Sequence, residues 1–172
     1  GLPLRRTSRS PVGTLALAVL LVAFALGCTS EIDSMTDRAH GLQESGELEE
    51  SIAVLRGVLE KDPDHPKANF LLGIALVQSE KFQPAIAPLE IATSSDLYAI
   101  PAGLLLASTQ FRTQRFEESV RTCNDILELD PHNLTAIFTR GQSYMGDGNV
   151  EAALADANTL LGYRPDAQNA IM

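Results

Sequence analysis

Histidine and cysteine are the side chains best suited to catalysis or metal binding, and both are scarce in this sequence. The histidines are His40, His65 and His132, and the cysteines are Cys28 and Cys123. No Gly-rich phosphate loop, nucleophile elbow or zinc-type spacing of Cys and His accompanies them. The sequence therefore predicts a protein that is not an enzyme and that has no catalytic residues, cofactor or metal site.

The most metal-like stretch is Asp62-Pro63-Asp64-His65, where two carboxylates and an imidazole fall within four residues. A proline-bearing polar turn is also a common way to end one helix and begin the next. Acidic pairs such as Glu49-Glu50 and Glu117-Glu118 suit the positively polarised N-terminal ends of helices. We interpret these groups as helix caps and first-turn charges rather than as metal ligands.

The composition favours a helical, acidic protein. Of the 172 residues, 45% are hydrophobic but only 5% are aromatic, which is typical of helices built from Ala and Leu. The net charge is −9, and it becomes −12 when Arg5, Arg6 and Arg9, the only charged residues of the first thirty, are set aside. An acidic surface repels phosphate backbones, so nucleic acid is not an expected partner. No small-molecule substrate is expected either.

The N-terminal segment has the layout of an export signal. Three arginines precede an apolar run from Leu15 to Gly27, which is shorter than the roughly 18 residues that a membrane span needs. The run ends at Ala25-Leu26-Gly27-Cys28, which resembles the bacterial lipobox. The resemblance implies a signal peptide over residues 1–27, a lipid on Cys28 and a short linker over residues 28–34.

This resemblance also implies a location in the bacterial cell envelope. Thr29 follows the lipidated cysteine, and this favours the outer membrane, with the protein facing the periplasm. A secreted protein cut by an ordinary signal peptidase, or a protein held in the inner membrane by an uncleaved segment, are the alternatives. The first residue is Gly1 rather than Met, which indicates a fragment or a wrongly assigned start.

Small residues recur along the chain every 34 positions without an insertion. One such column, small enough to let two helices approach closely, consists of Ala39, Gly73, Ala107 and Gly141. A second small column consists of Ser51, Ala85, Ser119 and Ala153. A third column contains proline in three of four units, at Pro63, Pro131 and Pro165. A period of this length indicates a repeat architecture.

These columns resemble the tetratricopeptide repeat, whose pattern runs Trp-x-x-Leu-Gly-x-x-Tyr, then Ala-x-x-x-Phe, then Pro. Good local matches are Leu72-Gly73, Gly141 with Tyr144, and Pro131. The resemblance implies an all-α fold, an α-solenoid of about four antiparallel helix pairs. We place the repeats at residues 32–65, 66–99, 100–133 and 134–167, with a further helix starting at residues 168–172.

The departures from the pattern carry predictions of their own. The Trp column reads Met35, Asn69, Gly103 and Ile137, so neighbouring side chains must supply more of the packing there. Arg140 replaces a leucine, and Cys123 replaces a phenylalanine, where we expect a buried, inert thiol. We also expect a helix to stop at residues 94–96, with Pro101 in the first turn of the next helix.

The resemblance implies that a partner binds on the concave face, which the first helix of each repeat lines. The groove-facing positions of repeats two to four are mostly apolar. They are Phe70, Ile74, Val77, Leu104, Ser108, Phe111, Phe138, Gln142 and Met145. Thr36 and His40 stand where a basic clamp for a carboxylate would begin, so we expect an apolar helix or peptide instead. The alternative is that the protein's own segments or tighter coiling cover this stripe.

Together these features predict an interaction scaffold that is lipid-anchored in the bacterial envelope and serves as an assembly or adaptor factor for a protein partner. An alternative is a membrane-anchored repeat subunit that regulates an enzyme complex. Another is a fragment of a larger protein with a catalytic domain beyond Met172. The sequence does not identify the partner.

Overall fold

A computed structural model describes residues 31–163, and all regular structure in this range is helical. Residues 31–44 form the first described helix. The others are α2 (Leu48–Lys61), α3 (Pro66–Gln78), α4 (Phe82–Thr93), α5 (Ala99–Arg112), α6 (Phe116–Leu129), α7 (Leu134–Gly146) and α8 (Val150–Gly162). The predicted all-α architecture is confirmed. The signal peptide, Cys28, Pro165 and residues 168–172 lie outside the described residues.

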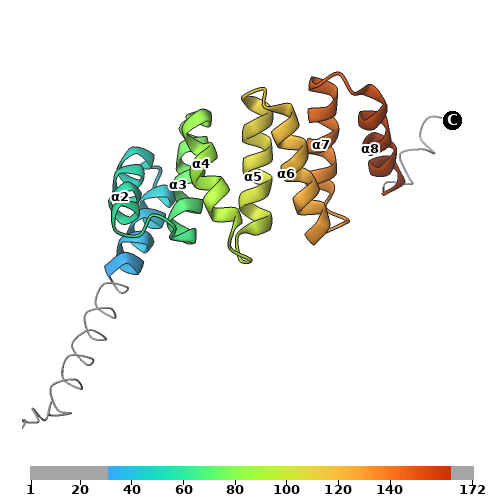
Figure 1. The fold of residues 1–172 in the computed structure, drawn as a ribbon. Coiled ribbons are helices and arrows are strands. Elements are labelled where there is room, and N and C mark those ends of the chain that lie inside the picture. The colour runs from blue at the N-terminus through green and yellow to red at the C-terminus, as the bar shows by residue number, and fades with distance from the viewer. Residues whose placement is uncertain (1–30, 164–172) are drawn as a thin grey trace, which may run out of the picture.

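The helices stack in one direction as antiparallel pairs (Figure 1). From α2 to α8 each helix contacts the next along the chain, and α5 also contacts α3, just as α7 also contacts α5. Both α5 and α7 therefore lie against the two helices of the preceding pair. This arrangement makes an elongated α-solenoid in which each pair depends on its neighbours to bury its apolar faces.

The turn inside each helix pair has the same backbone conformation every 34 residues. The residue at this position has a positive φ in all four pairs. These residues are Gly46 (φ 83°), Glu80 (58°), Gln114 (60°) and Gly148 (82°). In the first turn the N–H of Glu47 donates to the carbonyl of Leu42 at 2.8 Å, and that of Gly46 to Gln43 at 3.0 Å. This pattern is a Schellman motif, in which a left-handed residue ends the helix.

Helices α3 and α7, which are the first helices of their pairs, begin at a side-chain cap. His65 accepts a hydrogen bond from the N–H of Ala68 at 3.1 Å, and Asn133 accepts one from Ala136 at 3.0 Å. The expected stop near residue 94 is confirmed, because α4 ends at Thr93. Pro101 lies in the first turn of α5, as expected.

The two small columns meet inside each pair. A Cβ on Gly73 would overlap Leu89 of α4, which is fully buried. In the first pair the hydroxyl of Ser51 donates to the carbonyl of Ala39 at 2.9 Å. The same bond recurs two pairs later, from Ser119 to Ala107. Of the proline column, Pro63 and Pro131 are exposed.

Two pairs have a different residue at the position where the tetratricopeptide pattern has tryptophan: Asn69 in α3 and Gly103 in α5. Asn69 is buried, and its amide donates to the carbonyls of Pro63 at 2.8 Å and His65 at 3.1 Å. Gly103 leaves room for a neighbour, and an added Cβ there would lie 3.0 Å from Cγ1 of Ile126. In α3 the packing that a tryptophan would give is therefore replaced by the Asn69 amide, which bonds to the backbone. In α5 it is replaced by Ile126 of α6, which lies beside Gly103.

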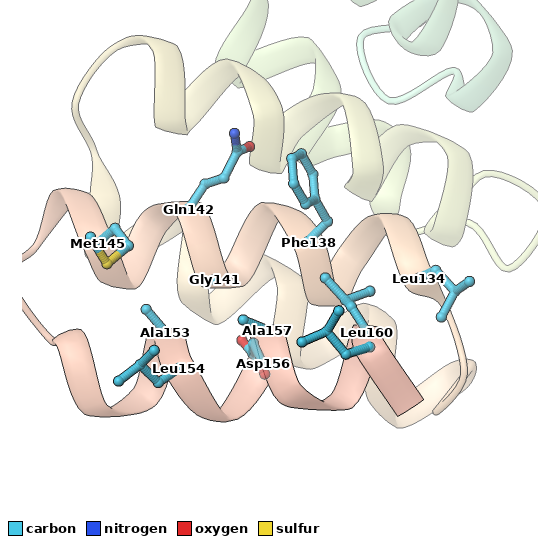
Figure 2. Close-up of a pocket in the computed structure, with 11 residues that line it drawn as sticks. Leu134, Phe138, Gly141, Gln142, Met145, Ala153, Leu154, Asp156, Ala157 and Leu160 are labelled. Atoms are coloured by element: carbon cyan, nitrogen blue, oxygen red, sulfur yellow. The ribbon is translucent and has the colours of Figure 1, made fainter. Parts of the chain in front are cut away.

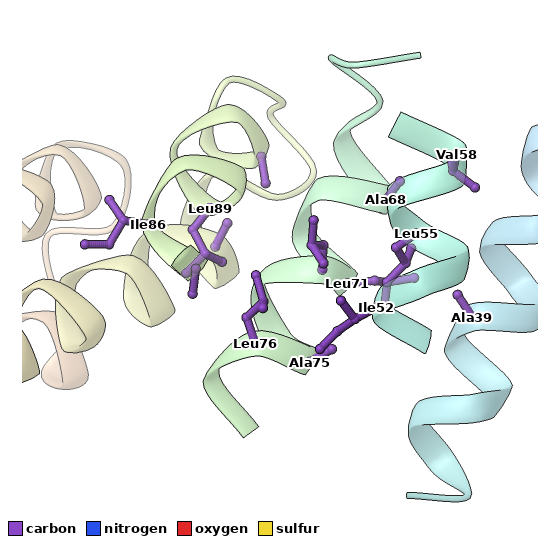
Figure 3. Close-up of a cluster of buried hydrophobic side chains, with 14 of the residues drawn as sticks. Ala39, Ile52, Leu55, Val58, Ala68, Leu71, Ala75, Leu76, Ile86 and Leu89 are labelled. Atoms are coloured by element: carbon purple, nitrogen blue, oxygen red, sulfur yellow. The ribbon is translucent and has the colours of Figure 1, made fainter. Parts of the chain in front are cut away.

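A continuous core of buried aliphatic side chains runs through the first three pairs, from Ala39 to Leu106 (Figure 3). Leu55, Leu89 and Val58 have no exposed surface. Burial of such side chains contributes about 1.5–3 kcal/mol each. This core makes the first three pairs the apolar centre of the described solenoid.

Candidate partner-binding surface

An apolar groove with a volume of about 690 Å³ lies between α7 and α8 (Figure 2). We call it the α7–α8 groove. Its lining residues are Leu134, Phe138, Gly141, Gln142, Met145, Ala153, Leu154, Asp156, Ala157, Leu160 and Leu161. Phe138 is 55% exposed, Met145 57% and Leu154 58%. Contiguous exposed apolar surface of this kind typically marks an interaction site.

Helical spacing explains why these side chains share one face. On α7, Leu134, Phe138 and Met145 follow one another at intervals of four and seven residues, so they lie on one face of the helix. On α8, Leu154, Ala157 and Leu161 follow the same rule. Together these two apolar faces, on antiparallel neighbours, line the α7–α8 groove.

The floor of the groove is closed by an ion pair. Arg140 of α7 donates from Nε to Oδ2 of Asp156 at 2.9 Å and from Nη2 to Oδ1 at 2.6 Å. Its Nη1 also donates to Asn124 of α6 at 2.7 Å. The hydrogen bond to Asp156, which is 4% exposed, raises the pKa of the Arg140 guanidinium. The carboxylate in the floor is therefore neutralised, and the groove is effectively apolar.

The nine predicted groove residues do not all lie together. Phe138, Gln142 and Met145 line the α7–α8 groove and are exposed, and we call these three residues the α7 stripe. The other six lie on α3 and α5 and are partly buried. They are Phe70, Ile74, Val77, Leu104, Ser108 and Phe111. The exposed apolar surface of this set is therefore concentrated at the α7 end of the solenoid.

Aromatic contacts account for part of this burial. The ring centroids of Phe70 and Tyr98 are 5.0 Å apart, and those of Phe111 and Phe116 are 5.8 Å apart. Phe70 and Phe111 thus pack against neighbouring rings within the solenoid. A substitution at Phe111 would disturb packing, so it is a poor probe of binding.

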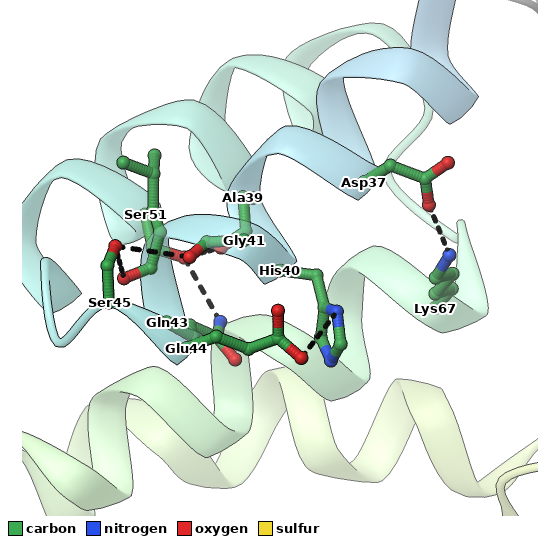
Figure 4. Close-up of polar contacts among 10 residues, drawn as sticks. Asp37, Ala39, His40, Gly41, Gln43, Glu44, Ser45, Ser51 and Lys67 are labelled. Atoms are coloured by element: carbon green, nitrogen blue, oxygen red, sulfur yellow. Dashed lines mark hydrogen bonds and ion pairs between the residues drawn. The ribbon is translucent and has the colours of Figure 1, made fainter.

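The first described helix has a polar face instead (Figure 4). Thr36 is buried and donates to the carbonyl of Ile32 at 2.7 Å. Gln43 donates to Ser51 at 3.0 Å and to the carbonyl of Leu71 at 2.9 Å. His40 is exposed, and its Nδ1 lies 3.9 Å from Oε1 of Glu44. This face of the first described helix thus offers mainly hydrogen-bonding groups.

The remaining reactive side chains are structural. Cys123 is fully buried as expected, and burial raises the pKa of its thiol to about 12. His65 and His132 lie at helix starts, where His65 acts as a cap. Within residues 31–163, no group of three His, Cys, Asp or Glu side chains could hold a metal ion. No helix in that range is long and apolar enough to span a membrane.

Two features of the groove were not predicted from the sequence. The α8 side, with Leu154, Leu160 and Leu161, shows a helical apolar period that could have been found by examining the second helices too. The partner of Arg140 was not identifiable, because Asp156 lies 16 residues away on another helix.

Comparisons with known proteins agree with this architecture. Residues 36–99 match a family model described as tetratricopeptide repeat. The structure of MamA 41-end from Desulfovibrio magneticus RS-1 is similar, with a TM-score of 0.69 and 16% identity over 78% of this chain and 76% of that one. The fold is a tetratricopeptide-repeat solenoid.

Curated relatives share the repeat region only. A DnaJ homolog subfamily C member 3 homolog from Dictyostelium discoideum is 27% identical over 137 residues, which cover 70% of this chain and 27% of the relative. The peroxisomal targeting signal receptor of Komagataella phaffii is 33% identical over 95 residues, covering 55% of this chain and 16% of the relative. The chain thus spans about a quarter or less of their length, so the likeness extends to the repeat solenoid and not to the whole relatives.

Proposed function

We propose that this chain is a protein-interaction scaffold that binds an apolar helix or extended apolar segment of a partner protein along its concave face. The observation that carries the proposal is the α7 stripe, where Phe138 and Met145 are more than half exposed on either side of Gln142. A soluble protein that keeps a phenylalanine and a methionine in contact with water gains stability when a partner covers them.

The chemistry of the concave face defines the expected partner. Exposed basic residues do not line the α7–α8 groove, and its one carboxylate, Asp156, is paired with Arg140. An acidic or basic peptide would therefore lose its hydration without gaining an ion pair. An apolar helix face, anchored by large aliphatic or aromatic side chains, loses little and buries area on both sides. Tetratricopeptide arrays are interaction scaffolds in general, and the name of one relative, peroxisomal targeting signal receptor, is compatible with such a role.

The test is capture of partners by the purified chain from extracts of its source organism, compared by quantitative mass spectrometry. The double variant Phe138→Ser/Met145→Ser is expected to lose the specific partner, because both side chains are exposed and their loss leaves the fold intact. Leu97→Ser is the matched control, since Leu97 is 74% exposed and lies outside the groove. Capture by the double variant at the wild-type level would contradict the proposal.

We also propose that a lipid on Cys28 holds the scaffold at the bacterial envelope. The expected site is the outer membrane, with the protein facing the periplasm. The support is the sequence alone: three arginines, an apolar run and the terminal Gly27-Cys28. Metabolic labelling with palmitate should mark the wild-type chain and not Cys28→Ala. Equal labelling of both chains, or labelling of neither, would overturn this anchor.

A further inference from the structure

A polar pocket is formed by residues of α4, α5 and α6, which lie side by side in the middle of the solenoid (Figure 1). Its volume is about 470 Å³, within the range of about 300–1,000 Å³ that is typical of ligand sites. We call it the α4–α6 pocket. None of its lining residues belongs to the α7–α8 groove or to the nine predicted groove positions. An inference drawn from this pocket therefore goes beyond the proposed function.

Acidic side chains dominate the charge of the α4–α6 pocket. Glu90 of α4 and both Glu118 and Asp125 of α6 line it, against the single basic residue Arg121, so three carboxylates and one guanidinium leave a net charge of −2. In the part of the chain that the structure describes, none of these three carboxylates forms an ion pair. Nη1 of Arg121 lies 3.9 Å from Oε2 of Glu117. The pocket therefore favours a cation.

A buried amide adds a hydrogen-bond donor to the pocket. Gln110 of α5 lines the pocket although it is only 3% exposed. Its Oε1 accepts a hydrogen bond from the hydroxyl of Thr122 at 2.8 Å, while its amide nitrogen donates to no other residue within 31–163. An acceptor oxygen on a ligand can take this N–H, which satisfies a donor that water reaches poorly. The pocket thus calls for an acceptor beside the cation.

The α4–α6 pocket continues into a smaller hollow of about 150 Å³ between α5 and α6. Leu106 and Thr122 line both spaces, so the two adjoin. Ala99, Ile126 and Leu129, which is 62% exposed, add apolar surface to the hollow. This end of the site favours a small aliphatic side chain.

We propose that the α4–α6 pocket binds an arginine residue of an extended segment of a partner protein, with an aliphatic residue next to that arginine. A guanidinium carries five N–H donors and no acceptor, so it can serve carboxylates that come from two helices. The backbone carbonyl of the segment accepts from Gln110, and the aliphatic neighbour enters the hollow beside Leu129. Three consecutive features of one peptide match the site.

A metal ion is a poorer match for the same charges. Within residues 31–163 no group of three His, Cys, Asp or Glu side chains is close enough to hold one. The carboxylates of the pocket are therefore spaced for a larger cation. A metal ion or a free amine would also leave the Gln110 amide without an acceptor.

Titration of the ¹⁵N-labelled chain at low salt with the blocked peptide acetyl-Leu-Arg-Leu-amide tests the proposal by NMR. The side-chain amide signals of Gln110, assigned by their loss in Gln110→Glu, should shift saturably. Acetyl-Leu-citrulline-Leu-amide has nearly the same shape without the charge and should bind about tenfold more weakly. Equal affinity for the two peptides would overturn the proposal. So would saturable binding without a shift of the Gln110 signals, or no binding of either peptide.

Charge variants of the pocket should act in opposite directions. Glu118→Gln/Asp125→Asn should weaken binding of the arginine peptide about tenfold and leave the citrulline peptide unaffected. Arg121→Gln should tighten binding of the arginine peptide about threefold, because it removes a like charge.

Glu60→Gln/Glu128→Gln is the matched control, since it removes two exposed carboxylates that do not line the pocket. This control should bind the arginine peptide like the wild type. Equal weakening by the control and by Glu118→Gln/Asp125→Asn would show that net charge alone attracts the peptide, and the proposal would fail.

The peptide also separates this site from the α7–α8 groove. Phe138→Ser/Met145→Ser should bind acetyl-Leu-Arg-Leu-amide as tightly as the wild type, because neither side chain lines the α4–α6 pocket. Loss of peptide binding in that variant would place the peptide in the groove and overturn the inference. Loss of partner capture by the same variant tests the scaffold proposal, so the two ideas can fail independently.

Discussion

The α5–α6 and α7–α8 pairs have the same repeat register but differ in what covers them. Leu104 and Phe111 of α5 are partly buried, whereas their counterparts Phe138 and Met145 of α7 are 55% and 57% exposed. The side chains are of similar apolar character in both pairs. The difference shows that positions of one apolar column are partly buried where another described helix follows, and that they stay exposed where none of the described helices does.

The pairs also differ in what holds them together. The continuous apolar core extends through the first three pairs to Leu106. The last pair depends more on polar contacts, including the Arg140–Asp156 ion pair and the hydroxyl of Ser143, which donates to Ser119 at 2.7 Å. We therefore expect the last pair to be sensitive to the loss of a charge and the earlier pairs to a change of volume.

The largest effect is expected from Arg140→Ala, which leaves Asp156 buried without its partner. The free energy of unfolding should fall by about 2–3 kcal/mol, somewhat less than for a fully buried pair because the Arg140 side chain is 23% exposed. Arg38→Ala is the matched control, since Arg38 occupies the same column in the first repeat and its bond to Glu50 is exposed. Its removal should cost less than about 1 kcal/mol. Urea unfolding measures both losses. Equal losses of unfolding free energy in Arg140→Ala and Arg38→Ala would contradict the difference expected between the buried and the exposed ion pair.

The second prediction compares three glycines by volume. Gly73→Ala should lower the free energy of unfolding by about 2 kcal/mol, because its new Cβ overlaps the fully buried Leu89. Gly141→Ala should cost less, since the nearest atom is Cβ of Asp156 at 3.3 Å. Gly57→Ala, whose only close neighbour is Met35 at 3.7 Å, should be neutral or stabilising.

Denaturant midpoints of these three variants give the order directly. If Gly141→Ala proved more damaging than Gly73→Ala, the last pair would be the tighter one. The α7–α8 pair would then not be the more loosely packed of the two pairs.

The smallest effect concerns the turns. Gln114 has a positive φ of 60° without being glycine, whereas Gly148 holds the same turn position in the last pair. Gln114→Gly should raise the free energy of unfolding by at most about 1 kcal/mol, because it removes the strain of a left-handed residue. Gly148→Ala should lower it by a similar amount. Thermal unfolding that responds in the opposite direction to either change would contradict the assigned turn geometry.

Much of the fold follows from local sequence signals. The small columns, the helix stop after Thr93 and the buried Cys123 all follow from residue type and spacing, because each depends on contacts inside one repeat. The exposure of Phe138 and Met145 does not, since it depends on whether a later helix covers them. The positive φ of Gln114 could not be predicted from the sequence either, because that turn contains no glycine at this position.

The candidate site was predicted in part for the same reason. The nine groove positions were read from first helices, so the three on α7 were included while Leu154 and Leu160 on α8 were missed. The Arg140–Asp156 pair joins residues on different helices. Comparing the same position in successive repeats does not reveal such a contact. These nine residues remain a prediction as a partner-binding set.

Site-specific photo-crosslinking tests the central claim most directly. A benzophenone amino acid is placed at Phe138, at its covered counterpart Leu104 or at the exposed control Leu97, and each chain is irradiated in extracts of the source organism. The account predicts a strong adduct with one partner from position 138, a weaker one from 104 and none from 97. Adducts of equal yield from all three positions, or none from 138, would contradict a scaffold that binds its partner on the exposed apolar face of its last repeat.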